Sequence, residues 1–388
     1  MRSPARSAAA ALACAALVAG CGSTAPAAPA PAAQAPPAGA PFLATSLATA
    51  ADTWAVAVMG GSVATHDNFW QLFARPAGSR SWKLVTPPGT ADNGGLVLAS
   101  AGRSMIAGFR PSQYLTYTPL TATADGGRAW SSTGPLDGAL ADVPDALAAA
   151  PATGSLLALL TDGTATEAAP VGYARWSTLA SSRALAATSP GRRCGLQNLT
   201  AAAFSPSGQP LLGGTCRHPG ALGIFTQTGG TWQAAGPSLP PALAGQAVRV
   251  LRLTGTADGT VALVAAGTSP ADRLLAAWSP GGGSQWVLSP PFLLNGARLV
   301  SASFGPGGAV AVVLSGNRGE TLTDSKAPWR ALPPLPPGTA TLAPGPGGAL
   351  DALAVHRTVL TVWHLAPRSA AWAPTQTINV PVQFGSSA

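Results

Sequence analysis

Charged side chains are scarce in this sequence: they make up 9% of its 388 residues, while hydrophobic residues make up 47%. A chain this apolar has enough side-chain surface to bury, which excludes general intrinsic disorder. Long helices are disfavoured as well, because 46 glycines and 38 prolines interrupt the sequence. The composition therefore favours a globular chain of many short strands joined by turns.

The residue types and motifs that mark many enzymes are also rare or missing. The chain has three tyrosines and two glutamates, and its four histidines, His66, His218, His356 and His364, show no metal-ligand spacing. We find no Gly-x-Ser-x-Gly elbow, phosphate-binding loop, dinucleotide fingerprint or basic run. We therefore expect no metal, no cofactor and no nucleic-acid partner.

The N-terminus has the layout of an export signal. Arg2 and Arg6 precede an apolar run over residues 8–18, which is too short to span a membrane as a mature helix. The run ends in Val-Ala-Gly-Cys at residues 18–21, which resembles the lipobox of bacterial lipoproteins. This resemblance implies that residues 1–20 are a signal peptide and that Cys21 is lipidated. It also implies that the chain is exported and anchored to the outer face of the cytoplasmic membrane. An ordinary secretory signal is the alternative.

The next segment, up to residue 41, is rich in proline and alanine and has nothing to bury. In polyproline II geometry, at about 3.1 Å per residue, it could hold a domain up to roughly 60 Å from the membrane. We expect residues 21–41 to form the lipidated cysteine and a tether. The folded domain is then expected to span residues 42–388.

Two sequence marks alternate along the rest of the chain, seven of each. The first is an apolar strand, a turn and a second apolar strand, with turns centred on Asp52, Gly102, Gly154, Gly208, Gly259, Gly308 and Gly348. The second is a turn that ends in tryptophan, at Trp82, Trp130, Trp176, Trp232, Trp286, Trp329 and Trp372. Strict alternation of the two marks indicates seven copies of one structural unit.

The best preserved tryptophan turn is Thr-Ala-Asp-Gly-Gly-Arg-Ala-Trp at residues 123–130. Asp125 can accept hydrogen bonds from backbone N–H groups, Gly127 can take a positive φ, and Trp130 can open the next strand. With Thr123, these residues resemble the Asp box of BNR (sialidase-type) repeat propellers. In that family the Asp boxes lie on the rim and do no chemistry, so the resemblance implies an architecture and not an activity.

Each repeat of about 50 residues then supplies four strands, which we name A to D from the centre outward. The sequence predicts an all-β fold, a seven-bladed β-propeller of four-stranded antiparallel blades. Two β-sandwiches are the alternative, although they would not predict alternation in register along the whole chain. Residues 377–384 appear as one strand more than blade 7 needs. We expect that strand to pair with blade 1 and close the ring.

Cysteine usage adds one long-range constraint. Cys14 and Cys21 belong to the signal region, so an exported chain retains Cys194 and Cys216, which favours a disulfide between them. Cys194 is expected to enter strand A of blade 4 and Cys216 to leave strand B, where antiparallel pairing brings them together. The bridge would hold an irregular segment over residues 177–198.

The predicted strand order places the A–B and tryptophan turns on one face of the ring and the B–C and D–A loops on the other. Binding residues concentrate in such loops. Our candidates lie in the B–C loops: His66, Asp67, Arg110, Arg217, Arg273, Arg318 and Arg357. Five of them are arginines at similar positions, and if they point inward they form a cationic ring suited to a carboxylate, phosphate or sulfate group. Ordinary solvated loop arginines are the alternative.

The overall charge agrees with either reading. Without Arg2 and Arg6, 20 basic residues remain against 14 acidic residues, a net charge of +6. An anionic partner such as a cell-wall polymer or acidic glycan would be attracted to such a chain, but residue usage and solubility explain the same number.

A sialidase-type enzyme is the competing hypothesis. In that family an arginine triad holds the sialate carboxylate, a tyrosine assisted by a glutamate is the nucleophile, and an aspartate is the acid/base. Residues 109–111, Phe-Arg-Pro, partly resemble the family's Phe-Arg-Ile-Pro signature but lack the isoleucine. Glu167 and Tyr173, which we expect to share the B–C loop of blade 3, are the candidate pair close in sequence.

Because glutamate and tyrosine are so few, we favour a non-catalytic binding or scaffold module with no assigned catalytic residue. The expected ligand is a protein, a cell-wall polymer or a glycan. A sialidase-like glycoside hydrolase is the alternative, and a purely structural envelope protein is a third possibility.

Overall fold

The computed structural model describes the strands between residues 43 and 132 and, with short gaps, residues 145–379. Residues 1–42 and 380–388 lie outside the described part, as do several connections, among them 61–67, 110–119, 133–144 and 170–175. Every described residue falls in one compact unit, Ala38–Ala388. The predicted signal peptide, Cys21 and the tether are therefore outside the described residues.

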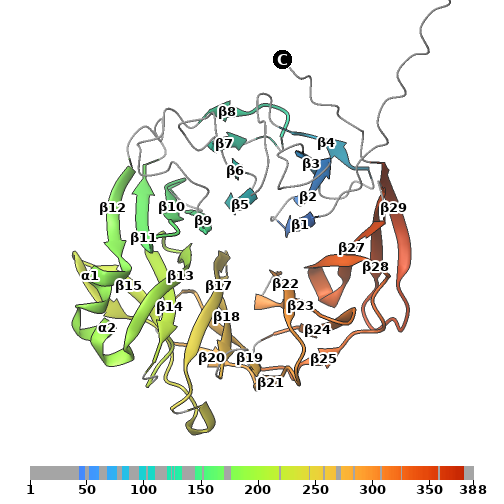
Figure 1. Ribbon diagram of the computed structural model, residues 1–388. Helices are drawn as coiled ribbons and strands as arrows, with labels where there is room; N and C mark the ends of the chain where they lie inside the picture. Colours follow the sequence, from blue (N-terminus) through green and yellow to red (C-terminus); the bar gives the residue numbers. More distant parts are fainter. Residues whose placement is uncertain are drawn as a thin grey trace, which may run out of the picture. The chain divides into compact units, whose positions relative to one another are not determined.

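The predicted fold is confirmed: the chain is a seven-bladed β-propeller in which each blade is built from four consecutive antiparallel strands (Figure 1). The innermost strands, A, are β1 (Leu43–Ala48), β5 (Leu96–Ala101), β9 (Ala146–Ala149), β13 (Leu196–Phe204), β17 (Val248–Thr256), β22 (Leu299–Phe304) and β26 (Thr339–Pro344). The B strands are β2 (Asp52–Gly60), β6 (Ser104–Phe109), β10 (Leu156–Leu159), β14 (Pro210–Cys216), β18 (Gly259–Ala266), β23 (Val310–Leu314) and β27 (Leu350–His356).

The outer half of each blade follows the same order. The C strands are β3 (Asn68–Pro76), β7 (Leu120–Thr123), β11 (Thr164–Ala168), β15 (Ile224–Thr228), β19 (Arg273–Pro280), β24 (Arg318–Leu322) and β28 (Val359–Leu365). The D strands are β4 (Lys83–Leu84), β8 (Ser131–Ser132), β12 (Trp176–Ser181), β16 (Thr231–Ala234), β20 (Val287–Leu288), β25 (Arg330–Ala331) and β29 (Ala373–Asn379). A short extra strand, β21 (Phe292–Leu293), also pairs with β19.

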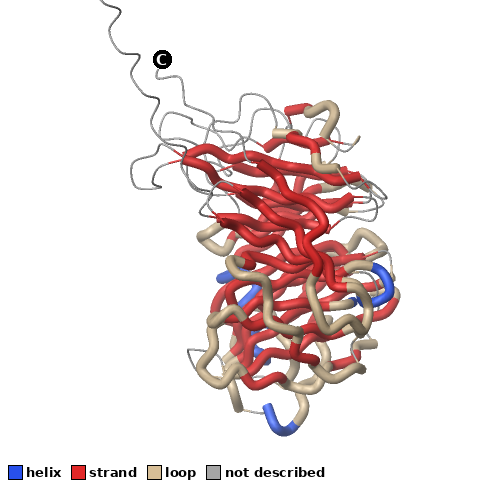
Figure 2. Tube along the Cα trace, turned by 90° about the vertical axis from the view of Figure 1, so that its right-hand side faces the viewer, coloured by secondary structure: helices blue, strands red, loops and turns tan. Residues whose placement is uncertain are grey.

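Strands run between the two faces of the ring, and the connections lie at their ends (Figure 2). Each tryptophan of the second sequence mark lies at the start of a D strand, or directly before it, as predicted. The register shifts by one residue at one point in each of the A strands β17, β22 and β26, and at two points in β13. Such β-bulges increase the local twist of a strand and re-aim its side chains.

The hydrophobic core lies between neighbouring blades. One cluster joins blades 3, 4 and 5 and contains the buried Phe204 and Phe225. Further clusters join blades 5 and 6, blades 6 and 7, and blades 7 and 1. The sheets of blades 4 to 7 thus bury both faces against their neighbours, which explains why β18 and β23 are continuously apolar or nearly so.

The expected closure by an extra C-terminal strand is wrong over residues 377–379. These residues belong to β29, where Ile378 pairs with Leu360 of β28 inside blade 7. β29 has seven residues, whereas β25 in the preceding blade has two. The longer β29 therefore includes residues that we had assigned to an additional strand. Blade 1 has its own four strands. Residues 380–384 lie outside the described chain.

The disulfide between Cys194 and Cys216 is present, with the two Cα atoms 5.2 Å apart. Cys216 ends β14 as predicted, but Cys194 ends helix α2 (Ser189–Cys194) and does not enter β13. The segment thought irregular is ordered: it contains β12, α1 (Ser182–Ala186) and α2. Thr188 caps α2, since its hydroxyl accepts from the Gly191 N–H at 3.2 Å.

Candidate functional site

The B–C edge of blades 4, 5 and 6 carries the part of the predicted arginine set that the structure describes. Arg217 directly follows β14, Arg273 begins β19 and Arg318 begins β24. Strand order therefore places them at the same edge of three consecutive sheets. The other candidates, His66, Asp67, Arg110 and Arg357, lie outside the described residues, so the ring of five arginines stays a prediction.

Arg217 is exposed, and its position is fixed by local hydrogen bonds. Its backbone N–H donates to the Gly195 carbonyl at 3.2 Å, beside the disulfide. With the Gln197 amide turned so that its oxygen faces the guanidinium, Arg217 Nε and Nη2 donate to that oxygen at 2.7 and 2.8 Å. Its remaining N–H groups are then held in a defined direction, as anion recognition requires.

Arg273 is half-buried at the start of its strand. Among the described residues, its Nε atom is buried and has no hydrogen-bond partner. A buried donor without a partner costs free energy unless water or a ligand satisfies it. Arg273 is therefore a group with unused hydrogen-bonding capacity at the B–C edge.

Arg318 is exposed, and its positive charge influences the pKa of Glu320, a buried acid two residues further along the same strand. Glu320 is 8% exposed. Burial raises the pKa of the Glu320 carboxyl, and the positive charge of Arg318 partly opposes that rise. No hydrogen bond or ion pair links Arg217, Arg273 and Arg318 to one another within the described chain.

Two arginines that sequence reasoning missed, Arg249 and Arg252, are exposed in the innermost strand β17. All the predicted candidate residues lie in loops, whereas Arg249 and Arg252 lie inside a strand. The alternating run Val-Arg-Val-Leu-Arg-Leu at residues 248–253 is the signal that could have found them.

We expected Glu167 and Tyr173 to share the B–C loop of blade 3. For Glu167 this expectation is wrong. Glu167 lies in β11, in register with Leu157 of β10, and the B–C turn of blade 3 is at residues 160–163. Tyr173 lies outside the described residues. Burial raises the pKa of the Glu167 carboxyl, but the carboxyl is part of a strand and belongs to no B–C loop.

The turn at residues 123–130 has the predicted local geometry. Asp125 Oδ1 accepts from the N–H groups of Arg128 and Ala129 at 2.9 and 3.0 Å, and Gly127 has a φ of 81°. The hydrogen bond from Ala129, followed by that from the Thr123 hydroxyl, lowers the pKa of Asp125. The Trp130 indole N–H donates to the Val85 carbonyl of blade 1 at 2.8 Å, so the turn joins neighbouring blades.

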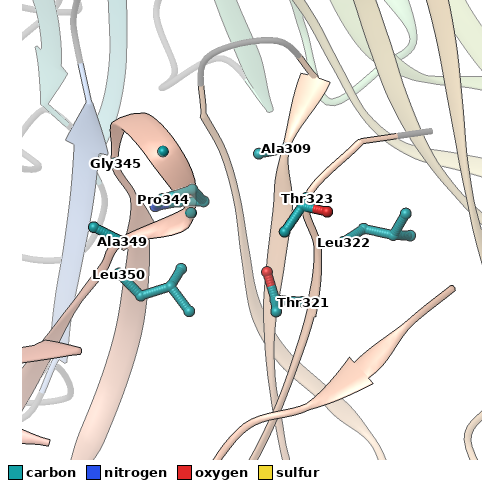
Figure 3. A pocket seen from close by; sticks show the side chains of 10 residues that line it. Ala309, Thr321, Leu322, Thr323, Pro344, Gly345, Ala349 and Leu350 are labelled. Atoms are coloured by element: carbon teal, nitrogen blue, oxygen red, sulfur yellow. The ribbon is translucent and has the colours of Figure 1, made fainter. Parts of the chain in front are cut away.

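A pocket of about 240 Å³ lies between blades 6 and 7 at the A–B edge. Thr321, Leu322 and Thr323 form one wall, and Pro344 to Leu350 form the other (Figure 3). None of the residues that line it carries a titratable side chain. The pocket lining therefore offers no carboxylate, imidazole or amine for acid/base catalysis.

No group of three or more His, Cys, Asp or Glu side chains among the described residues is placed to hold a metal ion. No helix among those residues is long and apolar enough to cross a membrane.

Comparisons with known proteins agree on the fold class. No protein-family model matches the chain, and no curated protein matches its sequence. The β-propeller domain of Myceliophteria thermophila Cps50 (Swd1) is similar to it in structure, with a TM-score of 0.52 and 14% identity, over 83% of this chain and 99% of that one. The chain is therefore a β-propeller by structure as well as by sequence pattern.

Two YCF48 structures resemble it less closely in superposition. YCF48 bound to a D1 peptide has a TM-score of 0.48 and 15% identity, covering 85% of this chain and 97% of that one. YCF48 from Cyanidioschyzon merolae has a TM-score of 0.43 and 12% identity, covering 87% and 94%.

Proposed function

We propose that this β-propeller is a non-catalytic binding module whose B–C face meets an anionic partner: a protein, a cell-wall polymer or a glycan. The observation that carries the proposal is the alignment of Arg217, Arg273 and Arg318 at the same edge of three consecutive blades. Rigid sheets hold the three positions, and guanidinium groups suit carboxylate, phosphate and sulfate. The buried Nε of Arg273 adds a donor that a ligand could satisfy.

Binding is favoured over glycoside hydrolysis by the placement of the two glutamates. A retaining glycosidase needs two catalytic groups at a short, defined separation in an open site. The chain has two glutamates; one lies in β11 and the other is 8% exposed in β24. Neither belongs to a loop on the B–C face.

We further propose that the module is a lipoprotein of BNR-type repeats, exported and anchored through Cys21. The support is the Val-Ala-Gly-Cys sequence and the Asp-box-like hydrogen bonds of Asp125. Radioactive palmitate should label the chain in bacterial cells, and Cys21→Ala should abolish that label. Labelling that survives Cys21→Ala would contradict the lipobox assignment.

The binding proposal is tested with the purified mature chain and isolated cell-envelope fractions. We expect binding that weakens at high salt. The variant Arg217→Gln/Arg273→Gln/Arg318→Gln should bind at least about tenfold more weakly, because it loses three charge-assisted contacts. The matched control Arg128→Gln/Lys326→Gln/Arg330→Gln removes three charges elsewhere and should keep the affinity.

An equal loss of affinity in both triple variants would show that net charge alone drives binding. That result would contradict a specific role for the B–C face. Hydrolysis of a sialoside substrate that disappears in Glu167→Gln would overturn the non-catalytic reading and support the glycosidase. Absence of binding to every fraction would overturn the binding function itself.

A further inference from the structure

Blades 4 and 5 are joined by backbone hydrogen bonding and not by packing alone. At its end, β14 pairs with β17 as well as with β13: Thr215 lies opposite Arg249, and Cys216 opposite Val248. Strands β13, β14 and β17 therefore form one continuous antiparallel sheet close to the centre of the ring (Figure 1). The blades described elsewhere form separate sheets.

The register places two arginines, Arg249 and Arg252, on one face of this sheet, and Arg217 lies just past the end of the neighbouring strand. Residues paired across strands point to the same side, and side chains alternate along a strand. Arg249 is paired with Thr215, so these two residues share a face, and Arg217 follows directly after the end of β14. Arg249 is also paired with Ala265, and after the bulge Arg252 is paired with Leu263, which keeps Arg252 on that face.

The neighbouring strand adds two amides. Asn198 is paired with Thr215 and so lies on the same face. The side-chain oxygen of Gln197 accepts the two hydrogen bonds from the Arg217 guanidinium. We call this surface the arginine platform; its residues are Gln197, Asn198, Thr215, Arg217, Arg249 and Arg252. Thr215 is half-buried, and the other five are exposed.

The platform has positive charge without a counter-ion. Within the described part of the chain, the ion pairs involve only Arg75, Asp351 and His364, so no carboxylate described there forms an ion pair with the platform arginines. Asp272 is exposed at the same end of blade 5, but β18 separates it from β17. Although Arg252 is exposed, the protein around it displaces part of its hydration shell, and this desolvation lowers its pKa. An exposed, partly dehydrated guanidinium without a partner is a favourable site for an anion.

We infer that the arginine platform binds an acidic peptide segment with carboxylates at alternate positions. Arg249 and Arg252 lie on one face about two strand steps apart, because the bulge takes up one residue. This separation is roughly 7 Å, the repeat of same-face side chains in an extended peptide. Arg217 lies just past the end of the adjacent strand β14, two residues beyond Thr215, which is the partner of Arg249. The inference rests on the proposed binding function and specifies its site and partner.

A peptide is favoured over an acidic glycan because none of the six platform residues is aromatic. Flat rings that stack on a sugar are therefore missing from this surface. The amides of Gln197 and Asn198 can instead donate to and accept from a peptide backbone that lies across the sheet.

The test uses the full mature chain and a fluorescent peptide, acetyl-(Glu-Ser)4, with acetyl-(Gln-Ser)4 as the neutral control. Anisotropy should show salt-sensitive binding of the acidic peptide only. Arg249→Gln/Arg252→Gln should raise Kd about 30-fold, because two guanidinium contacts are lost. Arg128→Gln/Arg330→Gln removes the same charge elsewhere and should change Kd less than about twofold. Arg252→Lys should recover part of the affinity, since it restores the charge without the planar fork.

The outcomes separate this inference from the binding function. Equal losses in the two double variants would overturn the platform, because charge alone would then explain binding. A polygalacturonate oligomer that binds more tightly than the peptide and depends on Arg249 would overturn the peptide as partner. If envelope binding depends on Arg273 and Arg318 while the peptide does not bind, the arginine platform is contradicted as a peptide site. The proposed binding function is then still supported. Unchanged circular dichroism of each variant is the check that all of them fold.

Discussion

Arg75 and Asp351 are 276 positions apart in the sequence and form an ion pair that joins blade 1 to blade 7. Asp351 also contacts His364 Nδ1 at 2.9 Å, and Arg75 lies over the Trp82 ring, 5.3 Å from its centroid. A hydrophobic cluster that contains Phe73 and Ile378 packs between the same blades. The described residues therefore close the ring by side-chain contacts between its first and last blades.

Loss of this ion pair should weaken the closure. The Arg75 and Asp351 side chains are only 18% and 20% exposed, so removing one partner leaves the other incompletely solvated. We expect Arg75→Gln or Asp351→Asn to lower the free energy of unfolding by about 1–3 kcal/mol, measured by urea titration. The exposed Arg330→Gln serves as the control. Equal stability of Arg75→Gln and Arg330→Gln would contradict a role for the pair.

The tryptophan turns should stabilise the junctions between blades through their indole N–H groups. Trp286 donates to the Ala235 carbonyl of blade 4 at 2.6 Å, and Trp329 to the Pro290 carbonyl of blade 5 at 3.0 Å. Trp286→Phe should cost about 1 kcal/mol more than Trp82→Phe, because the buried Trp82 N–H has no partner among the described groups. Both costs come from thermal or urea unfolding. The explanation fails if Trp82→Phe costs as much.

The disulfide should contribute measurably to stability. It closes a loop with a sequence separation of 22 residues, for which the loop-entropy model gives about 3 kcal/mol. Reduction should lower the unfolding free energy by about that amount in the wild-type chain. Cys194→Ser/Cys216→Ser should show the same lower stability and no further response to reductant. A wild-type chain that is insensitive to complete reduction would refute this contribution.

Glu320 should make stability depend on pH. Burial raises its folded-state pKa above the ordinary value of 4.5. The protonated form is therefore favoured in the folded chain, and the associated stability is present below pH 4.5 and lost as the pH rises through the raised pKa. Glu320→Gln should remove this component and be the more stable chain, relative to wild type, near neutral pH.

The same acid reports on Arg318. Because the positive charge of Arg318 lowers the pKa of Glu320, Arg318→Gln should raise that pKa further. Carbon-13 NMR of chain labelled at glutamate can follow both carboxyls, Glu167 and Glu320, through a pH titration. Glu167 lies in another blade and should not respond. A shift of both resonances, or of neither, would contradict a local charge effect.

Much of the fold follows from patterns within single repeats. Apolar strands joined by Gly- or Pro-containing turns indicate hairpins, and a tryptophan at the end of the following turn marks the outermost strand. The count of seven blades needed only the alternation of these two marks. The disulfide also followed from local pairing, since Cys194 and Cys216 flank one hairpin and few cysteines remained to choose from.

The errors arose where strand length and strand bounds depend on neighbours. Residues 377–379 extend an edge strand because β28 offers seven residues to pair with. Glu167 belongs to a strand because β10 and β11 are joined by a short turn at residues 160–163. The lengths of β29 and β11 are not encoded in a turn motif, so the local sequence pattern did not define where either strand begins or ends.

For this chain, the sequence by itself determined the all-β class, the number of blades and the cysteine pairing, because these depend on turn chemistry and hydrophobic period over a few residues. Only the tertiary structure decided that Arg249 and Arg252 share one sheet face beside Arg217 and that Arg75 meets Asp351. Those relationships depend on register between blades, which bulges shift by single residues, and a shift of one residue sends a side chain to the opposite face.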